Sequence, residues 1–245
     1  MTIQDKIVAV TGAGRGIGRA TALHLAARGA RLVLGARSET ELAAVVDQIE
    51  AAGGEAVFRV TDVTQRSDLE ALVGLACQRF GRLDVIVNNA GIGPISRFDA
   101  LRVEDWDAMI DVNLRGTLYG IAAALPVFGQ QRKGHIVNVL STAGLKIVPT
   151  MGVYAATKNA MRTASEALRQ EAGPHLRVTE VSPGFIDTTF ADASITDPDV
   201  RAAINKQKEE LAISPEAIAR AIAFAIEQPD DVEVGSIVVR PTAQD

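Results

Sequence analysis

The sequence predicts an α/β fold in which a doubly wound parallel sheet of about seven strands carries helices on both faces. Short apolar segments alternate with longer helical ones along all 245 residues, as in parallel strands joined by crossover helices. A hydrophobic content of 47% with only 4% aromatic residues indicates a core of Ala, Val, Leu and Ile. This composition suits a sheet covered by helices. The length fits one domain, residues 1–245, with a sizeable core.

The first half of the chain supplies four strands and three helices. A glycine-rich turn follows the first strand, and Gly29 stops the first helix. The second helix ends at Gly53 and Gly54. The expected strands are 6–11, 31–36, 56–60 and 83–88, and the expected helices are 16–28, 39–52 and 68–80.

The second half continues the alternation through three more strands. One long helix is expected over 103–128, and a helix rich in small residues over 152–172. Residues 189–212 mix small, acidic and basic side chains, which suits a lid that closes over a substrate; the alternative is an ordinary pair of surface helices. The remaining expected elements are strands 135–140, 177–181 and 236–239 and a helix over 215–227.

Charge and composition exclude several classes of function. The net charge is −5, without a basic stripe, which argues against nucleic-acid and anionic-membrane partners. No window approaches the roughly 18 apolar residues of a spanning helix, and the N-terminus lacks a secretory pattern. Cys77 is a lone cysteine and excludes an internal disulfide. His24, His135 and His175 have no partner at metal-ligand spacing. We expect a soluble, cytoplasmic protein without a metal site.

Residues 141–158, STAGLKIVPTMGVYAATK, carry the clearest candidate chemistry. Ser141 follows an apolar strand and so lies at a carboxyl end, where open parallel sheets place their ligand clefts. Tyr154 and Lys158 lie four residues apart on one helix and share a face. A phenol is a poor base at neutral pH, and an adjacent cation is the simplest way to lower its pKa. The set indicates acid–base chemistry on a carbonyl or carbinol; the alternative is a half-buried aromatic beside a solvated lysine.

A glycine-rich turn, T-G-A-G-R-G-I-G, joins the first strand to the first helix at residues 11–18. At this place backbone N–H groups and the helix dipole can hold a pyrophosphate. Gly12, Gly16 and Gly18 would lie at the turn, at the closest phosphate approach and at the helix–strand contact. The spacing is G-x-x-x-G-x-G, and a tight turn without a ligand is the alternative. The strand–turn–helix context favours nucleotide binding.

Six motifs in one order resemble those of the short-chain dehydrogenases/reductases, over nearly the whole chain. They are T-G-x-x-x-G-x-G at 11–18, N-N-A-G at 88–91, Asn113 in the long helix, Ser141, Y-x-x-x-K at 154–158 and P-G-x-x-x-T at 183–188. The resemblance implies a Rossmann-like fold and a nicotinamide-dependent oxidoreductase that acts on a small carbonyl or alcohol.

The resemblance also implies catalytic roles for four residues. Ser141 would hydrogen-bond the substrate carbonyl oxygen, and Tyr154 would deliver a proton to it as hydride arrives; oxidation runs in reverse. Lys158 would hold the nicotinamide ribose hydroxyls and lower the tyrosine pKa. Asn113 would anchor a water that links the lysine to solvent. The structural alternative for Asn113 is a buried amide that satisfies a helix irregularity, and both roles are compatible.

A larger set is expected around the cofactor. Asn88 and residues 90–91 would line it, with Asp62 on the adenine side; Asp62 is equally well interpreted as a helix N-cap or loop residue. The full expected cofactor-binding set is Gly12, Arg15, Gly16, Ile17, Gly18, Arg37, Asp62, Val63, Asn89, Ala90, Gly91, Tyr154, Lys158, Pro183, Gly184, Ile186 and Thr188.

Charge favours NADP over NAD as the cofactor. An NAD site needs a carboxylate near the end of the second strand to accept from the adenosine ribose. That place holds Gly-Ala-Arg-Ser at 35–38, with no acid before Glu39. Arg37 and Arg15 would instead clamp a 2'-phosphate by charge-assisted hydrogen bonds. The alternative is that Arg15 is a solvated loop charge, with NAD as the cofactor.

The substrate pocket is expected to be apolar. Residues 145–153 and Phe185 would supply its walls, with Lys146 as the only nearby charge if it points inward, which favours a neutral ketone or secondary alcohol. The ending R-P-T-A-Q-D differs from the V-D-G-G of many ketoacyl-reductase-like members and argues against a role in fatty-acid synthesis. Trp106 and Met109 are expected in the core or at a subunit interface.

Family members are commonly tetrameric, so the resemblance implies a homo-oligomer, a tetramer or a dimer. The Ala-rich faces of 105–128 and 155–168 are compatible with this, although a face that covers its own core looks the same. Two functions from different classes remain. One is an NADP-dependent carbonyl reductase or alcohol dehydrogenase, with an NAD-preferring alcohol dehydrogenase as a variant. The other is a non-catalytic dinucleotide-binding sensor. The intact catalytic set favours the enzyme.

Overall fold

The computed structural model describes residues 3–190 and 198–244 and confirms the predicted α/β architecture. Seven parallel strands form one sheet within these residues, in the order β3-β2-β1-β4-β5-β6-β7. The strands are β1 Ile7–Thr11, β2 Arg31–Ala36, β3 Glu55–Val60, β4 Val85–Asn88, β5 Gly134–Val139, β6 Leu176–Pro183 and β7 Ser236–Val239. The order reverses between β1 and β4, which places a ligand crevice outside their carboxyl ends.

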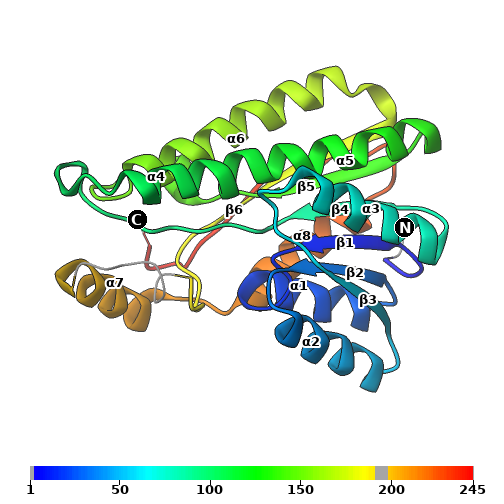
Figure 1. Ribbon diagram of the computed structural model, residues 1–245, viewed down its shortest axis with the longest axis horizontal. Coiled ribbons are helices and arrows are strands. Elements are labelled where there is room, and N and C mark those ends of the chain that lie inside the picture. The colour runs from blue at the N-terminus through cyan, green and yellow to red at the C-terminus, as the bar shows by residue number, and fades with distance from the viewer. Residues whose placement is uncertain (1–2, 191–197, 245) are drawn as a thin grey trace.

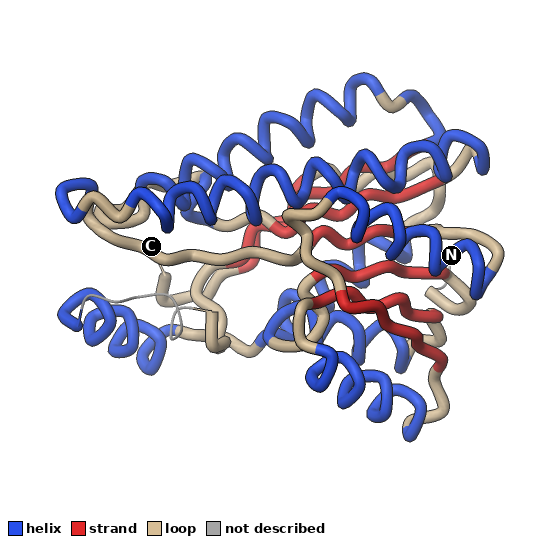
Figure 2. The backbone as a smooth tube through the Cα atoms, viewed as in Figure 1, coloured by secondary structure: helices blue, strands red, loops and turns tan. Residues whose placement is uncertain are grey.

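The helices cover both faces of the sheet (Figure 1). They are α1 Gly16–Ala27, α2 Glu39–Ala51, α3 Arg66–Phe80, α4 Val103–Met109, α5 Gly116–Gln131, α6 Gly152–Glu171, α7 Pro198–Leu211 and α8 Pro215–Glu227. Helices α3, α5 and α6 lie on one side of the strands, and α1, α2 and α8 lie on the other (Figure 2). No helix in the described parts of the chain is long and apolar enough to cross a bilayer.

Alternation along the strands builds two separate cores. In β1, Val8 and Val10 join the cluster under α1, α2 and α8, whereas Ile7 and Ala9 join the cluster under α3, α5 and α6. Successive side chains of a strand point to opposite faces, so a sheet covered on both sides needs a continuous apolar run. The run KIVAVT supplies one.

The predicted long helix over 103–128 is not continuous. A π-helical turn, Ile110–Arg115, separates α4 from α5, and α5 continues to Gln131. The Thr117 hydroxyl donates to the Asn113 backbone carbonyl at 2.9 Å, so a side chain satisfies a carbonyl in the irregular turn. Inserted turns of this kind are frequent at functional sites. The apolar pattern alone does not distinguish them from a regular helix.

The predicted lid at 189–212 falls partly outside the described residues, at 191–197. The rest contains α7, which begins at Pro198 and is linked to the segment after β6 by an ion pair between Lys208 and Asp187 at 3.3 Å. Helix α7 and α4 lie at the carboxyl-end side of the sheet, and the N-terminus lies at the opposite side (Figure 1). The position suits a lid, and closure stays a prediction.

Helix α1 approaches the end of β1 so closely that Gly18 has no room for a side chain. A Cβ at Gly18 would lie 2.2 Å from the Gly12 carbonyl oxygen and 2.6 Å from Asn89 Nδ2. The neighbour in this contact is backbone, which cannot move aside as a flexible side chain does. The expected role of Gly18 in helix–strand packing is therefore confirmed.

We predict that Gly18→Ala lowers the free energy of unfolding by about 1–3 kcal/mol, the usual cost of overpacking. Gly74→Ala is the matched control, because Gly74 lies inside α3 and an added Cβ meets nothing within 4 Å. That variant should gain up to about 1 kcal/mol from helix propensity. Urea unfolding measures both values, and equal stability of the two variants would contradict the packing argument.

Candidate active site

The glycine turn has the conformation that a phosphate-binding loop requires. Gly12 has φ of +65° and Gly16 has φ of +53°, which side-chain-bearing residues rarely adopt. A Cβ at Gly16 would lie 3.2 Å from Thr188 Cγ2, so the turn meets the segment after β6. This contact brings the first and last predicted cofactor motifs together at one edge of the sheet.

A set of hydrogen bonds joins the turn to the end of β4. The Thr11 hydroxyl accepts from the backbone N–H groups of Asn89 at 3.0 Å and Ala90 at 3.1 Å. The Asn89 side chain donates to the backbone carbonyls of Thr11 at 2.9 Å and Gly12 at 3.3 Å. Asn88 is buried and donates instead to Asn138 at 2.9 Å. Asn89 to Gly91 therefore border the turn, and Asn88 is a core residue.

Ser141, Tyr154 and Lys158 come together at the carboxyl end of β5. Ser141 caps a short 3₁₀ turn by accepting from the Ala143 N–H at 3.1 Å. Lys158 is only 5% exposed, and its Nζ donates to the Val139 carbonyl at 3.0 Å. This Nζ atom lies 5.9 Å from the centre of the Tyr154 ring. The solvated-lysine alternative is therefore wrong, because the ammonium is buried against β5.

Burial sets the electrostatics of this pair. It raises the pKa of Tyr154 to about 12, although hydrogen bonding by Ser141 acts in the opposite direction. It lowers the pKa of Lys158 to about 8. The expected lowering of the tyrosine pKa is not seen, because loss of water around the buried phenol is the largest effect and exceeds that of the Ser141 hydrogen bond. The Tyr154 phenol is therefore protonated at neutral pH.

Asn113 belongs to the π-helical turn, and its side chain bonds to the loop after β4 and to α6. It is 1% exposed. Its Oδ1 accepts from the Ile92 N–H at 2.8 Å, and its Nδ2 donates to the Ile92 carbonyl at 2.9 Å and to Thr157 at 3.2 Å. A Cβ at Gly91 would lie 3.3 Å from this Oδ1 and 3.5 Å from Lys158 Nζ. Asn113 is a buried amide, as the structural alternative expects, but its side chain satisfies the Ile92 backbone and Thr157 and not the irregular turn; the water-anchoring role stays a prediction.

Residues 6–199 match the family model described as short chain dehydrogenase. The chain belongs to the short-chain dehydrogenase family. The uncharacterized oxidoreductase Lmo0432 of Listeria monocytogenes is 45% identical over 247 residues, covering 100% of this chain and 99% of the relative. Membership and relatives together make this protein an oxidoreductase.

Two solved structures of the family share the whole architecture. The alcohol dehydrogenase of the archaeon Thermococcus sibiricus, complexed with 5-hydroxy-NADP, is 32% identical with a TM-score of 0.88 and covers 99% of both chains. A short-chain dehydrogenase/reductase of Burkholderia phymatum, in complex with NAD, is 29% identical with a TM-score of 0.88, covering 97% of this chain and 90% of its own. Such neighbours thus bind either nicotinamide dinucleotide.

The short-chain dehydrogenase motif after β6 lies beside the turn as expected. Pro183 ends β6, and the Gly184 N–H donates to the Val239 carbonyl at 2.8 Å. Ile186 pairs with Ile213 through an isolated bridge, which ties this segment to the connection between α7 and α8. Together with the contact of Thr188 against the glycine turn, the motif closes one side of the crevice.

The residues expected on the adenine side follow β3. Asp62 Oδ1 accepts from the N–H and hydroxyl of Thr64 at 3.0 and 2.9 Å, so the loop interpretation of Asp62 is confirmed; the helix N-cap is Gln65. Val63 packs against Gly116, where a Cβ would lie 2.8 Å from its Cγ2. Contact of these two residues with adenine stays a prediction.

Two arginines border the glycine turn and β2. Arg15 is the N-cap of α1, Arg37 directly follows β2, and both are exposed. Neither takes part in an ion pair with another described residue. Glu41 was missed by the sequence analysis: a Cβ at Gly14 would lie 2.7 Å from its Oε2. One carboxylate therefore borders the same turn as the two free cations.

Gln244 is a second residue that the sequence analysis missed. Its Oε1 accepts from the Phe185 N–H at 2.9 Å, and its Nε2 donates to the Thr142 hydroxyl at 3.4 Å. It thus links the segment after β6 to the loop that carries Ser141. The R-P-T-A-Q-D ending was the available signal, although nothing in it indicates this contact.

Aromatic residues pack around Tyr154. A small cavity next to Tyr154 is lined by Phe98 and Trp106, whose rings pack edge to face at 5.7 Å, and by Ser96, whose buried Oγ has no partner among the described residues. Trp106 is half-buried against Phe98, and its expected place in the core or at a subunit interface stays a prediction. Met109 is buried as expected, although it also lines the cavity. Lys146 is exposed.

We predict that Lys158→Met raises the free energy of unfolding near neutral pH by about 1–3 kcal/mol, since a depressed pKa records the cost of burying charge. In the folded protein the pKa of Lys158 is about 8, below its unfolded value. Between the folded and unfolded pKa values of Lys158, the free energy of unfolding of the wild type rises with pH. The greater stability of Lys158→Met is therefore present below about pH 8 and disappears toward pH 10.5.

Chemical unfolding at a series of pH values measures this difference. Lys146→Met is the control, because Lys146 is exposed and its loss should change stability by at most about 0.5 kcal/mol. A Lys158→Met variant that is less stable than the wild type at pH 7, or whose advantage does not depend on pH, would contradict the assignment of a buried charge.

Proposed function

We propose that this protein is an NADP(H)-dependent carbonyl reductase or alcohol dehydrogenase. The observation that carries the proposal is the convergence of Ser141, Tyr154 and the buried Lys158 at the carboxyl end of β5. Residues 89–91 connect this set to the glycine turn, because Asn89 bonds to the turn and a Cβ at Gly91 would lie 3.5 Å from Lys158 Nζ. A donor phenol, a hydroxyl and an ammonium beside a dinucleotide turn supply what carbonyl reduction needs.

Tyr154 is the proposed proton donor. Its pKa of about 12 keeps the phenol protonated at neutral pH, which is the form that protonates an oxygen in reduction. Ser141 Oγ accepts from Ala143, and its hydroxyl, which now bonds with Tyr154, would turn its proton to the same substrate oxygen. A bound nicotinamide supplies the hydride in reduction and accepts it in oxidation.

Lys158 is the proposed anchor for the nicotinamide ribose. Its ammonium has three donors, and the described structure uses one, for the Val139 carbonyl. The glycine turn fits the pyrophosphate, because its positive φ values and the N-terminus of α1 present backbone N–H groups. The residues present therefore suit a dinucleotide.

The NADP preference is supported by the two arginines at the edge of the turn. Arg15 and Arg37 are exposed without ion-pair partners among the described residues. A 2'-phosphate would supply the missing charge for both. Glu41 is a carboxylate in the first turn of α2 and lies against Gly14. If Glu41 instead accepted hydrogen bonds from the adenosine ribose hydroxyls, the cofactor would be NAD.

The proposed substrate is a neutral ketone or secondary alcohol with an apolar or aromatic group. Phe98 and Trp106 line the cavity beside Tyr154, and the Phe190 ring lies 5.9 Å from the tyrosine ring. Ile147, from the loop between β5 and α6, is 80% exposed. Exposed apolar groups near a crevice are typical of ligand-binding surfaces.

We predict that Tyr154→Phe lowers kcat for NADPH-dependent ketone reduction by about 10²–10⁴-fold, the usual contribution of general acid catalysis. Affinity for NADPH should be retained. Tyr119→Phe is the matched control, since Tyr119 is the other tyrosine of the chain and lies on α5. Absorbance assays of NADPH oxidation measure kcat, and fluorescence titration measures the affinity for NADPH. Undiminished turnover in Tyr154→Phe would exclude the phenol as the proton donor.

We predict that Arg37→Ala weakens NADPH binding by about 10–100-fold, the loss expected for hydrogen bonds to a charged group, and leaves NADH binding unchanged. Arg79→Ala, which removes an exposed arginine paired with Glu55, should change neither. An NADH preference in the wild type that persists in Arg37→Ala would refute the NADP assignment and leave the oxidoreductase assignment intact.

A further inference from the structure

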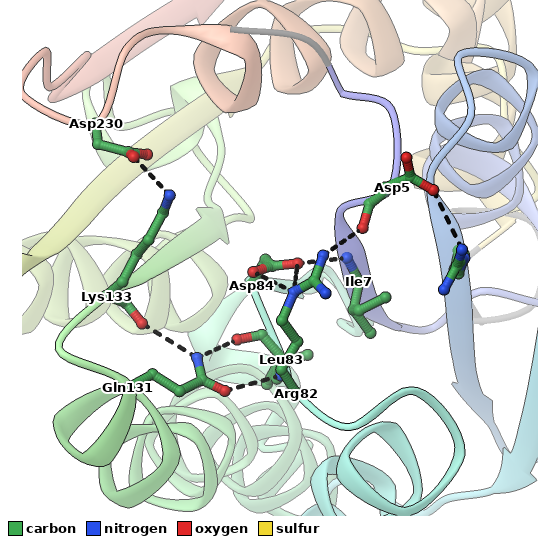
Figure 3. A network of polar contacts seen from close by, with 9 residues as sticks. Asp5, Ile7, Arg82, Leu83, Asp84, Gln131, Lys133 and Asp230 are labelled. Atoms are coloured by element: carbon green, nitrogen blue, oxygen red, sulfur yellow. Dashed lines mark hydrogen bonds and ion pairs between the residues drawn. The ribbon is translucent and has the colours of Figure 1, made fainter.

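A cavity of about 830 Å³ lies at the amino ends of the strands, opposite to the active site. Its walls come from the segment before β1, the segment before β4 and the connection from α5 to β5 (Figure 3). The residues that line it are Gln4, Asp5, Lys6, Arg82, Asp84, Gln131 and Lys133. Three are cations and two are anions, so the lining has a surplus of one positive charge.

The carboxylates of this cavity are already engaged. Asp84 accepts from the Ile7 N–H at 2.8 Å and from Arg82 Nε at 3.0 and 3.1 Å. Asp5 pairs with Arg31 at 3.2 Å, outside the cavity. Lys133 pairs with Asp230 at 2.5 Å (Figure 3). These contacts leave little free negative charge for a bound cation.

Lys6 differs from the other charged residues of the lining. It is 9% exposed, and no hydrogen bond or ion pair of its side chain occurs among the described residues. Burial lowers the pKa of Lys6; the charges of Lys133 and Arg177 add to this effect, and those of Asp230 and Asp84 oppose it. A buried ammonium without a partner is costly, and an anion in the cavity would relieve that cost.

Further donors face the same region. The described hydrogen bonds of Arg82 use Nε and Nη2, the latter to the Asp5 carbonyl at 2.6 Å, so Nη1 retains its N–H groups. Lys133 uses one of its three donors for Asp230. Gln131 is occupied by the Leu83 backbone at both ends of its amide. Lys6, Arg82 and Lys133 therefore line one cavity, Lys6 without a partner among the described residues and the other two with N–H donors left beyond their ion pairs.

We propose that this cavity binds a small oxyanion, a phosphate or a carboxylate, held by Lys6 with Arg82 and Lys133. A cation site is disfavoured, because the described residues contain no group of three His, Cys, Asp or Glu side chains that could hold a metal ion. The site lies at the opposite edge of the sheet from the glycine turn, so it is independent of the proposed function.

The test is thermal unfolding in inorganic phosphate or malonate, at ionic strength kept constant with sodium chloride and with saturating NADPH to occupy the cofactor site. The variants are Lys6→Met and, as a control with the same change in charge, Lys206→Met, which removes a lysine with a 76% exposed side chain on α7. Non-specific salting effects raise stability in all variants alike, whereas a bound anion gives a saturable rise.

We expect a saturable stabilisation of wild type and Lys206→Met, with the half-saturating concentration raised at least about tenfold in Lys6→Met. A lower half-saturating concentration for malonate would identify the ligand as a carboxylate, and a lower one for phosphate would identify it as a phosphate. Equal responses of all three proteins, or a rise that does not saturate with either anion, would overturn the proposal. Should Lys6→Met fail to fold, amide NMR of the wild type decides: shifts at Lys6, Ile7 and Asp84 support the site, and unmoved signals there refute it.

Discussion

The hydrogen bonds between Thr11 and the end of β4 are the constraint on which the rest of the site depends. One hydroxyl accepts from two successive backbone N–H groups, at 3.0 and 3.1 Å, while the Asn89 amide returns two bonds to the glycine turn. The strand order reverses between β1 and β4, so the connections that leave these two strands run in opposite directions across the sheet. A crevice is therefore left outside the carboxyl ends of the two strands. Side chains must therefore satisfy the backbone, and they hold the crevice open in one shape.

A second constraint is the charge of Lys158. Its burial opposes folding, and the same ammonium is the proposed anchor for the nicotinamide ribose. Its pKa of about 8 shows that burial disfavours the ammonium. The Val139 carbonyl compensates in part, and Asn113 and Thr157 satisfy each other's polar groups beside it. The π-helical turn belongs to the same arrangement, because it places Asn113 between the β4 loop and α6. Burying this charge works against folding, and such costs are common at active sites.

Sequence patterns predicted the fold because burial on both faces demands continuous apolar strands, and such strands are visible without coordinates. The Y-x-x-x-K spacing likewise predicts a shared helix face for Tyr154 and Lys158. The direction of the tyrosine pKa was not predictable, since it depends on how much protein surrounds the phenol. The π-helical turn and the link made by Gln244 were not predicted from the sequence for a related reason. Each depends on contacts between segments far apart in the chain, and no local periodicity indicates such contacts.

The two pKa shifts also bear on the direction of the proposed reaction. Removing the proton from a phenol with a pKa of about 12 costs roughly 7 kcal/mol at pH 7, at 1.36 kcal/mol for each unit. Reduction needs the phenol as it stands, whereas oxidation needs the phenolate and so an added positive charge beside it. The Lys158 ammonium lies 5.9 Å from the centre of the ring, and it loses charge above about pH 8. A higher pH favours deprotonation of Tyr154, but it also removes the Lys158 charge that stabilises the phenolate. Neutral conditions therefore favour Tyr154 as a proton donor, which is its role in reduction.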